Sequence, residues 1–402
     1  MGCGTSREAA KAAADPRLGM LMSPRVSRRL SSKSLENFEA VSPMVADDDA
    51  KLEKLKLPLN EDMQEDELAT EEEKAFLKEE IEARLEDADG TMKAFDETSK
   101  TRLFRGMITN NKGPMEKRIE EAVEMYGRVG AWLNAHGDVL EAELPGESVM
   151  FSSMGSTLGG QDLYGHVVWA EKLGDIGAIV DFPVSTEGAA AIRIKIMEAI
   201  RAAQIRANEA RGPQRYKQVY IIDLGQLSIT SLMARPAVRA MTLEIVKGAN
   251  AFYPECLWKL FVVNAPFVFR SVYSMVSPLI HEVTKKKIKI LGGPRTYFAE
   301  LEKNGIPRSA VPTCLGGGCP DAPLQDLIRD LVADGFPRAA RKTKSFAVAT
   351  DAAAEDAPSS PRGGGDGAAK KPAMILPVVV IAAAVFAGSS VLTGLYLSKA
   401  VQ

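Results

Sequence analysis

Hydroxyl and basic side chains lie beside a long apolar segment in this sequence. They are Thr284-Lys285-Lys286-Lys287, and the preceding residues 267–279 contain one arginine and three serines among mostly apolar side chains. A helix that is apolar on most sides must be buried, lie in a membrane or cover an apolar cavity. An apolar lid beside a cationic rim would suit a ligand with a long apolar body and an anionic head, which describes a phospholipid. The other interpretation, which composition alone favours, is a buried crossover helix followed by a solvated run of charges.

Short strands and longer helices must position these groups. Residues 260–263 and 288–291 are apolar runs typical of strands buried on both faces of a parallel sheet. The pattern further predicts a hairpin around 167–170, a strand at 218–224, helices at 115–136, 187–211 and 231–251, and one more helix that ends at Gly305. Strands that alternate with helices indicate an α/β fold with a mainly parallel sheet. In the helix at 187–211, basic side chains oppose the apolar face, namely Arg193, Lys195, Arg201 and Arg206.

Composition narrows the classes of function. With 402 residues, 46% hydrophobic and 26% charged, the chain can bury a full core and carry appendages. Its net charge of −3 argues against a general nucleic-acid binder. The four cysteines are scattered without zinc-type spacing, which favours a reducing, cytosolic setting.

Motifs for catalysis are missing from the sequence. It contains no G-x-S-x-G nucleophile motif, no P-loop and no G-x-G-x-x-G after a strand, and its histidines have no ligand spacing. We therefore predict a protein that is not an enzyme and that uses no metal or cofactor.

Several motifs together resemble the CRAL-TRIO family of lipid-binding proteins, which includes phosphatidylinositol-transfer proteins. The resemblance begins with Tyr253-Pro254-Glu255, continues through residues 263–267, and includes Thr284 and Lys287 ahead of 288–292. Residues 160–168 resemble the G-x-D-x-x-G-R-P-V hairpin of the family. Similar matches occur at residues 220–224, 311–312 and 316–317. The resemblance covers roughly residues 100 to 320 and implies a helical N-terminal lobe followed by a sheet over an apolar lipid pocket.

The resemblance also implies a headgroup site at Glu255, Thr284 and Lys287. There Lys287 would neutralise the phosphate of phosphatidylinositol, Thr284 would donate a hydrogen bond to it, and Glu255 would accept from inositol hydroxyls or orient the lysine. Glu255 could equally be a structural salt-bridge acceptor. Cys256 replaces an arginine that often follows this glutamate in the family, which puts the local ion-pair network in doubt. The expected pocket and gate residues are Trp169, Tyr220, Phe267, Phe269, Val272, Tyr273 and Val276.

The expected function is binding and transfer of phosphatidylinositol, or its presentation to a phosphoinositide kinase, with exchange through the helix at 267–279. Gln218 and Tyr220 replace the serine and threonine that serve a phosphatidylcholine site in the founding transfer protein, so any second ligand could be another lipid or a sterol-like molecule. The alternatives are a membrane-tethered scaffold without lipid exchange and a carrier of a neutral hydrophobic molecule.

The two ends of the chain predict membrane attachment. Gly2 lies in an M-G-x-x-x-[ST] pattern for myristoylation, Cys3 beside it could be palmitoylated, and a basic segment follows. Residues 374–397 carry no charge and would form about 36 Å of helix, enough to cross a bilayer core of about 30 Å. We expect a single-pass tail anchor that leaves the bulk of the chain in the cytosol.

The domain organisation follows from these segments. Residues 1–68 are predicted to be disordered, first basic and then acidic, and 69–140 to form the helical lobe, which a capping box begins. The lipid-binding domain would span 141–320, a short helix and flexible linker 321–373, and the transmembrane anchor 374–397.

Overall fold

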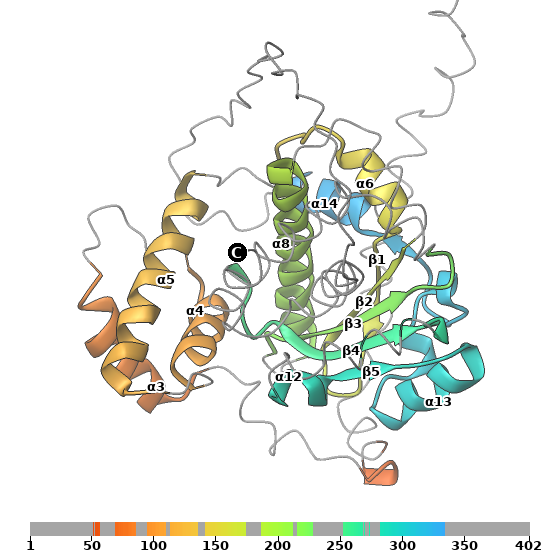
Figure 1. Cartoon of the computed structure of the whole chain (residues 1–402), viewed down its shortest axis with the longest axis horizontal. Helices are drawn as coiled ribbons and strands as arrows, with labels where there is room; N and C mark the ends of the chain where they lie inside the picture. Colours follow the sequence, from red (N-terminus) through yellow and green to blue (C-terminus); the bar gives the residue numbers. More distant parts are fainter. Residues whose placement is uncertain are drawn as a thin grey trace, which may run out of the picture.

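One mixed sheet organises the protein (Figure 1). The computed structural model describes residues 51, 53–56, 69–85, 95–109, 113–135, 141–173, 186–211, 215–227, 252–267, 269, 273 and 282–333. Within these residues, six strands form a sheet in the order β5-β4-β3-β2-β1-β6. The strands are β1 (Thr157–Gln161), β2 (Val167–Lys172), β3 (Gln218–Asp223), β4 (Leu257–Val263), β5 (Ile288–Ile290) and β6 (Ala322–Pro323).

The sheet is mainly parallel, as the sequence predicts. Strands β2 to β5 pair in parallel, whereas β1 runs antiparallel to β2 and β6. The predicted strands at 218–224 and 288–291 and the hairpin near residue 167 are confirmed to within a residue or two at their described ends. Strand β4 begins at Leu257, ahead of the predicted residue 260, so that Lys259 lies inside the strand instead of bounding it.

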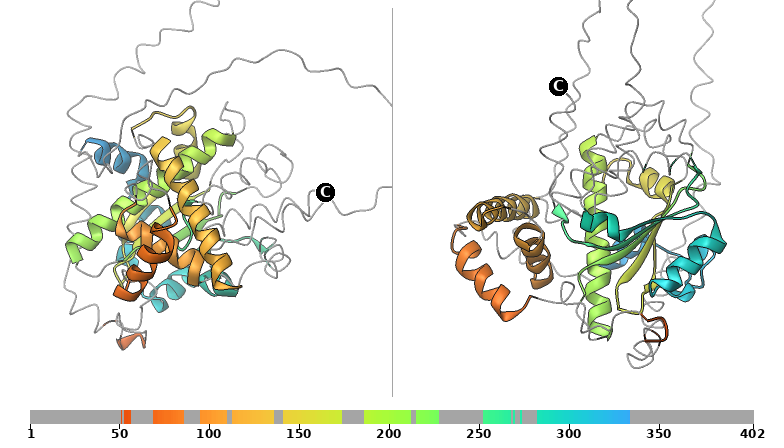
Figure 2. Two further views of the ribbon diagram at one scale, coloured as in Figure 1. Left: turned by 90° about the vertical axis from the view of Figure 1, so that its left-hand side faces the viewer. Right: turned by 60° about the horizontal axis from the view of Figure 1, so that its bottom comes forward.

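Helices cover both faces of the sheet. Helix α8 (Thr186–Arg211) crosses one face, and α6 (Glu147–Met154) and α14 (Leu324–Ala333) contact it. Helix α13 (Pro294–Lys303) packs against the opposite face, as the right-hand view of Figure 2 shows. Two short 3₁₀ helices, Arg308–Ala310 and Thr313–Leu315, follow α13. The helix predicted at 231–251 lies outside the described residues.

The prediction that basic residues of α8 face away from the core is wrong for two of them. Arg193 and Lys195 are buried, because each meets a carboxylate from another element. Arg193 pairs with Glu171 of β2, and Lys195 pairs with Glu147 of α6 at 2.8 Å. The helix is therefore covered on more than its apolar side.

The N-terminal lobe is helical, as predicted. It contains α3 (Glu71–Phe76), a π-helical turn at Leu77–Glu82, α4 (Glu97–Phe104), a second π-helical turn at Arg105–Thr109, and α5 (Met115–Ala135). The predicted capping box between Thr70 and Glu73 is present at the start of α3. A separate apolar core holds these helices together, with Leu103, Ala122 and Tyr126 fully buried in it.

Several sequence predictions concern residues outside the described part of the chain. These are the lipidation at Gly2 and Cys3, most of the segment 1–68, the linker after residue 333 and the anchor at 374–397. In the part that is described, none of the helices has both the length and the apolar character that a membrane span requires.

Candidate functional site

A buried ion pair joins the two central residues of the expected headgroup site. Glu255 lies in the turn before β4, and Lys287 is the last residue of α12 (Glu282–Lys287), directly before β5. Because β4 and β5 are parallel neighbours, the residues just ahead of both strands meet at the same end of the sheet. The Lys287 ammonium donates to a Glu255 carboxylate oxygen at 3.2 Å, and both residues are less than 9% exposed.

The pair retains unused hydrogen-bonding capacity. An ammonium has three N–H donors. Among the described residues, the Glu255 carboxylate is the one hydrogen-bond partner of Lys287 Nζ. Lys287 could therefore donate to a phosphate while it remains paired. Thr284 lies in the same short helix, but its side chain is outside the described part of the structure.

Arg102 of α4 holds the turn that carries Glu255. Its guanidinium donates to the carbonyl oxygens of Phe252 at 3.0 Å and Pro254 at 3.2 Å, and it lies 5.0 Å from the ring centre of Tyr253. Glu255 has a φ of 55°, a left-handed conformation that is uncommon for a residue with a side chain. The helical lobe thus supports the backbone geometry on which the ion pair depends.

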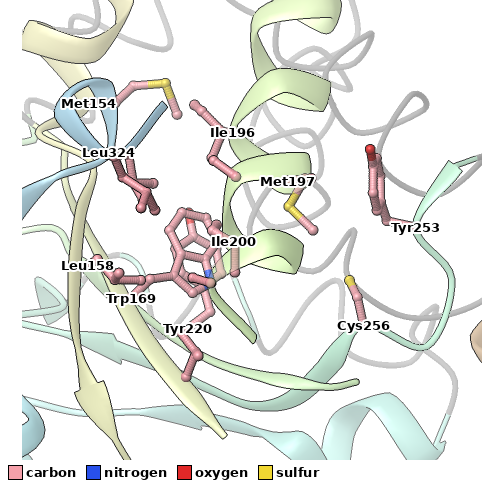
Figure 3. Close-up of a cluster of buried hydrophobic side chains, with 14 of the residues drawn as sticks. Met154, Leu158, Trp169, Ile196, Met197, Ile200, Tyr220, Tyr253, Cys256 and Leu324 are labelled. Carbon is pink, nitrogen blue, oxygen red and sulfur yellow. The ribbon is translucent and has the colours of Figure 1, made fainter. Parts of the chain in front are cut away.

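One face of the sheet forms an apolar surface beneath α8. A row of side chains crosses five strands through directly paired positions, and Figure 3 shows three of its members below Ile196, Met197 and Ile200 of α8. The rings of Trp169 and Tyr220 stack with their centres 3.9 Å apart and their planes 1° apart. The row consists of Leu158, Trp169, Tyr220, Leu260 and Ile288.

Two of the expected gate residues join this surface. Phe269 is 2% exposed and Tyr273 is partly buried, and both pack against the same apolar cluster. Phe267, in contrast, is 84% exposed. Val272 and Val276 lie outside the described residues. The structure therefore brings Trp169, Tyr220, Phe269 and Tyr273 to one cluster.

Sequence comparison matches this sheet to a known family. Residues 156–317 match the family described as the CRAL/TRIO domain, and this range contains β1 to β5 and the Glu255–Lys287 pair. This part of the chain is a CRAL/TRIO domain.

Individual relatives match the chain over a shorter length. It is 36% identical over 99 residues to the CRAL-TRIO domain-containing protein T23G5.2 of Caenorhabditis elegans, covering 25% of this chain and 14% of the relative. It is 35% identical over 99 residues to the phosphatidylinositol/phosphatidylcholine transfer protein SFH11 of Arabidopsis thaliana, covering 25% of each chain. The crystal structure of Sfh5 superposes with a TM-score of 0.42 and 16% identity, over 65% of this chain and 93% of that one. In both of these curated relatives, the matched segment is a quarter or less of the relative's own length.

A second buried polar cluster inside the CRAL/TRIO domain was not found by sequence reasoning. Glu171 of β2 accepts hydrogen bonds from Arg193 at 2.6 Å, from Ser156 at 3.1 Å and from the hydroxyl of Tyr220. All four residues are less than 9% exposed. The signal that could have revealed the cluster is a carboxylate, Glu171, that directly follows the apolar run 167–170 within the same strand.

A third network ties the helical lobe to the CRAL/TRIO domain. The hydroxyl of Tyr253 donates to Glu198 at 2.7 Å, and Glu198 pairs with Arg201 at 2.8 Å. Arg201 also pairs with Asp96, the N-cap residue of α4. Burial alone would raise the pKa of Glu198, but the Arg201 charge and hydrogen bonds from Arg201 and Tyr253 lower it below its ordinary 4.5. Glu198 is therefore held as a carboxylate.

Cys256 occupies an apolar position beside the ion pair. Its side chain is 5% exposed and belongs to the cluster under α8 (Figure 3). Burial raises the pKa of the Cys256 thiol above its ordinary 9.0. Cys256 therefore brings no positive charge to the site. Among the described residues, Glu255 forms its ion pair with Lys287.

Proposed function

We propose that this protein binds phosphatidylinositol and transfers it between membranes or presents it to a phosphoinositide kinase. The buried Glu255–Lys287 pair at the edge of an apolar sheet face is the observation that carries the proposal. The CRAL/TRIO match supports it, as does the relative whose name states that it is a phosphatidylinositol/phosphatidylcholine transfer protein.

The two parts of the ligand would meet two parts of the site. Lys287 donates to the lipid phosphate, Thr284 adds a hydrogen bond, and Glu255 orients the ammonium and accepts from inositol hydroxyls. The acyl chains lie against the apolar face of the sheet, where every apolar group removed from water favours binding. The helix that the sequence predicts at 267–279, with Val272 and Val276, would open to exchange the lipid.

Membrane attachment would keep the protein at its substrate. The segment 374–397 would anchor the chain in a bilayer with its bulk in the cytosol, and acylation at Gly2 and Cys3 would add a second attachment. In this arrangement the protein binds and delivers a lipid and catalyses no reaction.

Photo-crosslinking of the full chain tests the proposal. The protein is mixed with vesicles that contain a photo-crosslinkable phosphatidylinositol analogue, and labelling is compared among the wild type, Lys287→Ala and Thr284→Val. Lys286→Ala is the matched control, because Lys286 is a neighbouring lysine on α12 with an exposed side chain. We expect labelling of the wild type and the control, and at least a tenfold loss in Lys287→Ala. An unlabelled wild type would favour the scaffold, and labelling that none of these substitutions changes would favour a carrier of neutral hydrophobic molecules.

A further inference from the structure

Lysines gather at the end of the sheet where β3, β4 and β5 begin. Lys217 directly precedes β3, Lys259 is the third residue of β4, and Lys286 lies on α12 just before β5. Because these strands are parallel neighbours, the three lysines lie at the same end of the sheet. Two carboxylates lie there as well, but Glu255 and Asp162 are both less than 4% exposed and make their contacts inside the protein. Among the described residues, this end of the sheet therefore carries an excess of positive charge.

Trp258 gives this end of the sheet an apolar centre. Its side chain is partly exposed, and the His166 ring stacks on it with the ring centres 4.7 Å apart. The ammonium groups of Lys217 and Lys259 lie 5.8 Å and 5.5 Å from the Trp258 ring centre. Within the described part of the chain, the buried indole N–H of Trp258 has no acceptor, which is costly for a donor. The Trp258 surface, which also includes the three lysines, therefore suits an acidic ligand that carries apolar side chains.

The described chain is interrupted at residues 57–68 and resumes beside this surface. The helix that follows the interruption, α3, carries Glu73, which pairs with Arg105 at 2.9 Å. Arg105 donates in turn to the hydroxyl of Tyr216 at 3.1 Å, directly ahead of Lys217 in the chain. The Lys217 ammonium, part of the Trp258 surface, lies 5.5 Å from the Tyr216 ring centre. The residues that follow 57–68 are thus fixed next to the Trp258 surface.

The sequence of residues 57–68 complements the Trp258 surface. It is LPLNEDMQEDEL, with five acidic side chains, three leucines, one methionine and no basic residue. We infer that this acidic segment docks on the Trp258 surface of its own chain. Its carboxylates meet the lysines through charge-assisted hydrogen bonds, and an apolar side chain lies against the indole ring.

The covalent connection to α3 makes this contact easy to form. An extended chain of this length reaches about 40 Å, so the distance from α3 does not limit it. A short tether gives an effective concentration on the order of millimolar, and weak individual contacts then suffice. The docked segment neutralises this end of the sheet and keeps other acidic partners from it. The inference goes beyond the proposed function and holds whether or not the protein carries a lipid.

Zero-length cross-linking of the full chain tests the inference. A carbodiimide joins carboxylates to lysine ammonium groups that touch them, and mass spectrometry of the digested protein identifies the linked residues. We expect links from the acidic residues of 57–68 to Lys259 or Lys286. These links should fall about fivefold in 1 M salt, where the Debye length is about 3 Å.

A comparison of variants supplies a second measurement. Lys259→Gln with Lys286→Gln removes two charges from the Trp258 surface and leaves the headgroup ion pair intact. The matched control is Lys117→Gln with Lys172→Gln, because Lys117 is exposed on α5 and Lys172 is the last residue of β2, at the opposite end of the sheet. A glutamate-specific protease should cut residues 57–68 about fivefold faster in the surface variant than in the wild type and the control, since cleavage follows the undocked population.

Links from 57–68 that are confined to lysines outside this end of the sheet would overturn the inference, as would their complete absence. Links between two chains that increase with protein concentration would overturn it in favour of a second copy. Equal cleavage of the surface variant and the control would also overturn it, and would leave the Trp258 surface to an acidic partner from outside the chain.

Discussion

Replacing Lys287 separates a headgroup-binding role from a purely structural one. Its ammonium lies 3.2 Å from Glu255, and the two side chains are 10% and 4% exposed. Lys287→Met would leave the Glu255 carboxylate buried without a partner. Removing one member of a buried ion pair costs about 3 to 5 kcal/mol. We expect the free energy of unfolding to fall by that amount, measured by urea denaturation.

The double variant Glu255→Gln with Lys287→Met distinguishes the two roles. Removing both charges avoids the unpaired carboxylate, and replacement of a whole buried pair by neutral residues is often neutral for stability. We therefore expect its unfolding free energy to return to within about 1 kcal/mol of the wild type. Binding should not return, because a charge-assisted hydrogen bond to phosphate contributes about 1.5 to 3 kcal/mol, or roughly ten- to a hundredfold in affinity.

Affinity for phosphatidylinositol is measured by titrating the photo-crosslinkable analogue against each variant. Wild-type affinity in the stable double variant would refute the headgroup role and leave the pair as a structural salt bridge. If Lys287→Met lowered the unfolding free energy by less than about 1 kcal/mol, the reasoning about its buried partner would be wrong instead.

Three further predictions concern the support of the site. Arg102→Met leaves two carbonyl oxygens in the turn before Glu255 without their donor, so the free energy of unfolding should fall by about 2 to 4 kcal/mol. Labelling by phosphatidylinositol should fall as well, and unchanged labelling would show that the site does not depend on the Arg102 hydrogen bonds. Gly317→Ala would place a Cβ 1.9 Å from the Val311 carbonyl oxygen and should lower the melting temperature, at a cost of about 1 to 3 kcal/mol or more; a wild-type melting temperature would contradict this. The pKa of Glu198 is lowered in the folded protein, so its contribution to stability is complete above pH 4.5 and is lost as the pH falls further. Glu198→Gln should therefore flatten the dependence of stability on pH in that acidic range. An unchanged slope would show that Glu198 does not contribute to the pH dependence.

The secondary structure was predictable where local pattern and burial agree. Strand β3 and helices α5 and α8 are long runs with one periodicity, and the capping box before α3 is a local motif whose partners lie three residues apart. The start of β4 was missed because Lys259 was taken as a boundary. Lys259 is partly exposed and pairs with Val219 of β3, so sheet pairing extends beyond the apolar run.

Buried charges were the features that local pattern misjudged. Arg193 and Lys195 were placed opposite the apolar face of the helix, yet each is buried against a carboxylate from another element. Their partners are 22 and 48 residues away in the sequence, so no local pattern marks them. A charge can be buried only when its partner is present, and the fold supplies that partner.

The sequence by itself determined the class of fold, the CRAL-TRIO resemblance and the residue types of the candidate headgroup site, because periodicity and short motifs are local properties of a chain. The tertiary structure decided which of those residues meet. It paired Glu255 with Lys287 across 32 residues, and it brought Arg102 to the turn before Glu255 across about 150 residues. It also placed a guanidinium against Trp169 and Tyr220. Such contacts depend on the order and direction of strands in the sheet, which set which segments become neighbours whatever their separation along the chain.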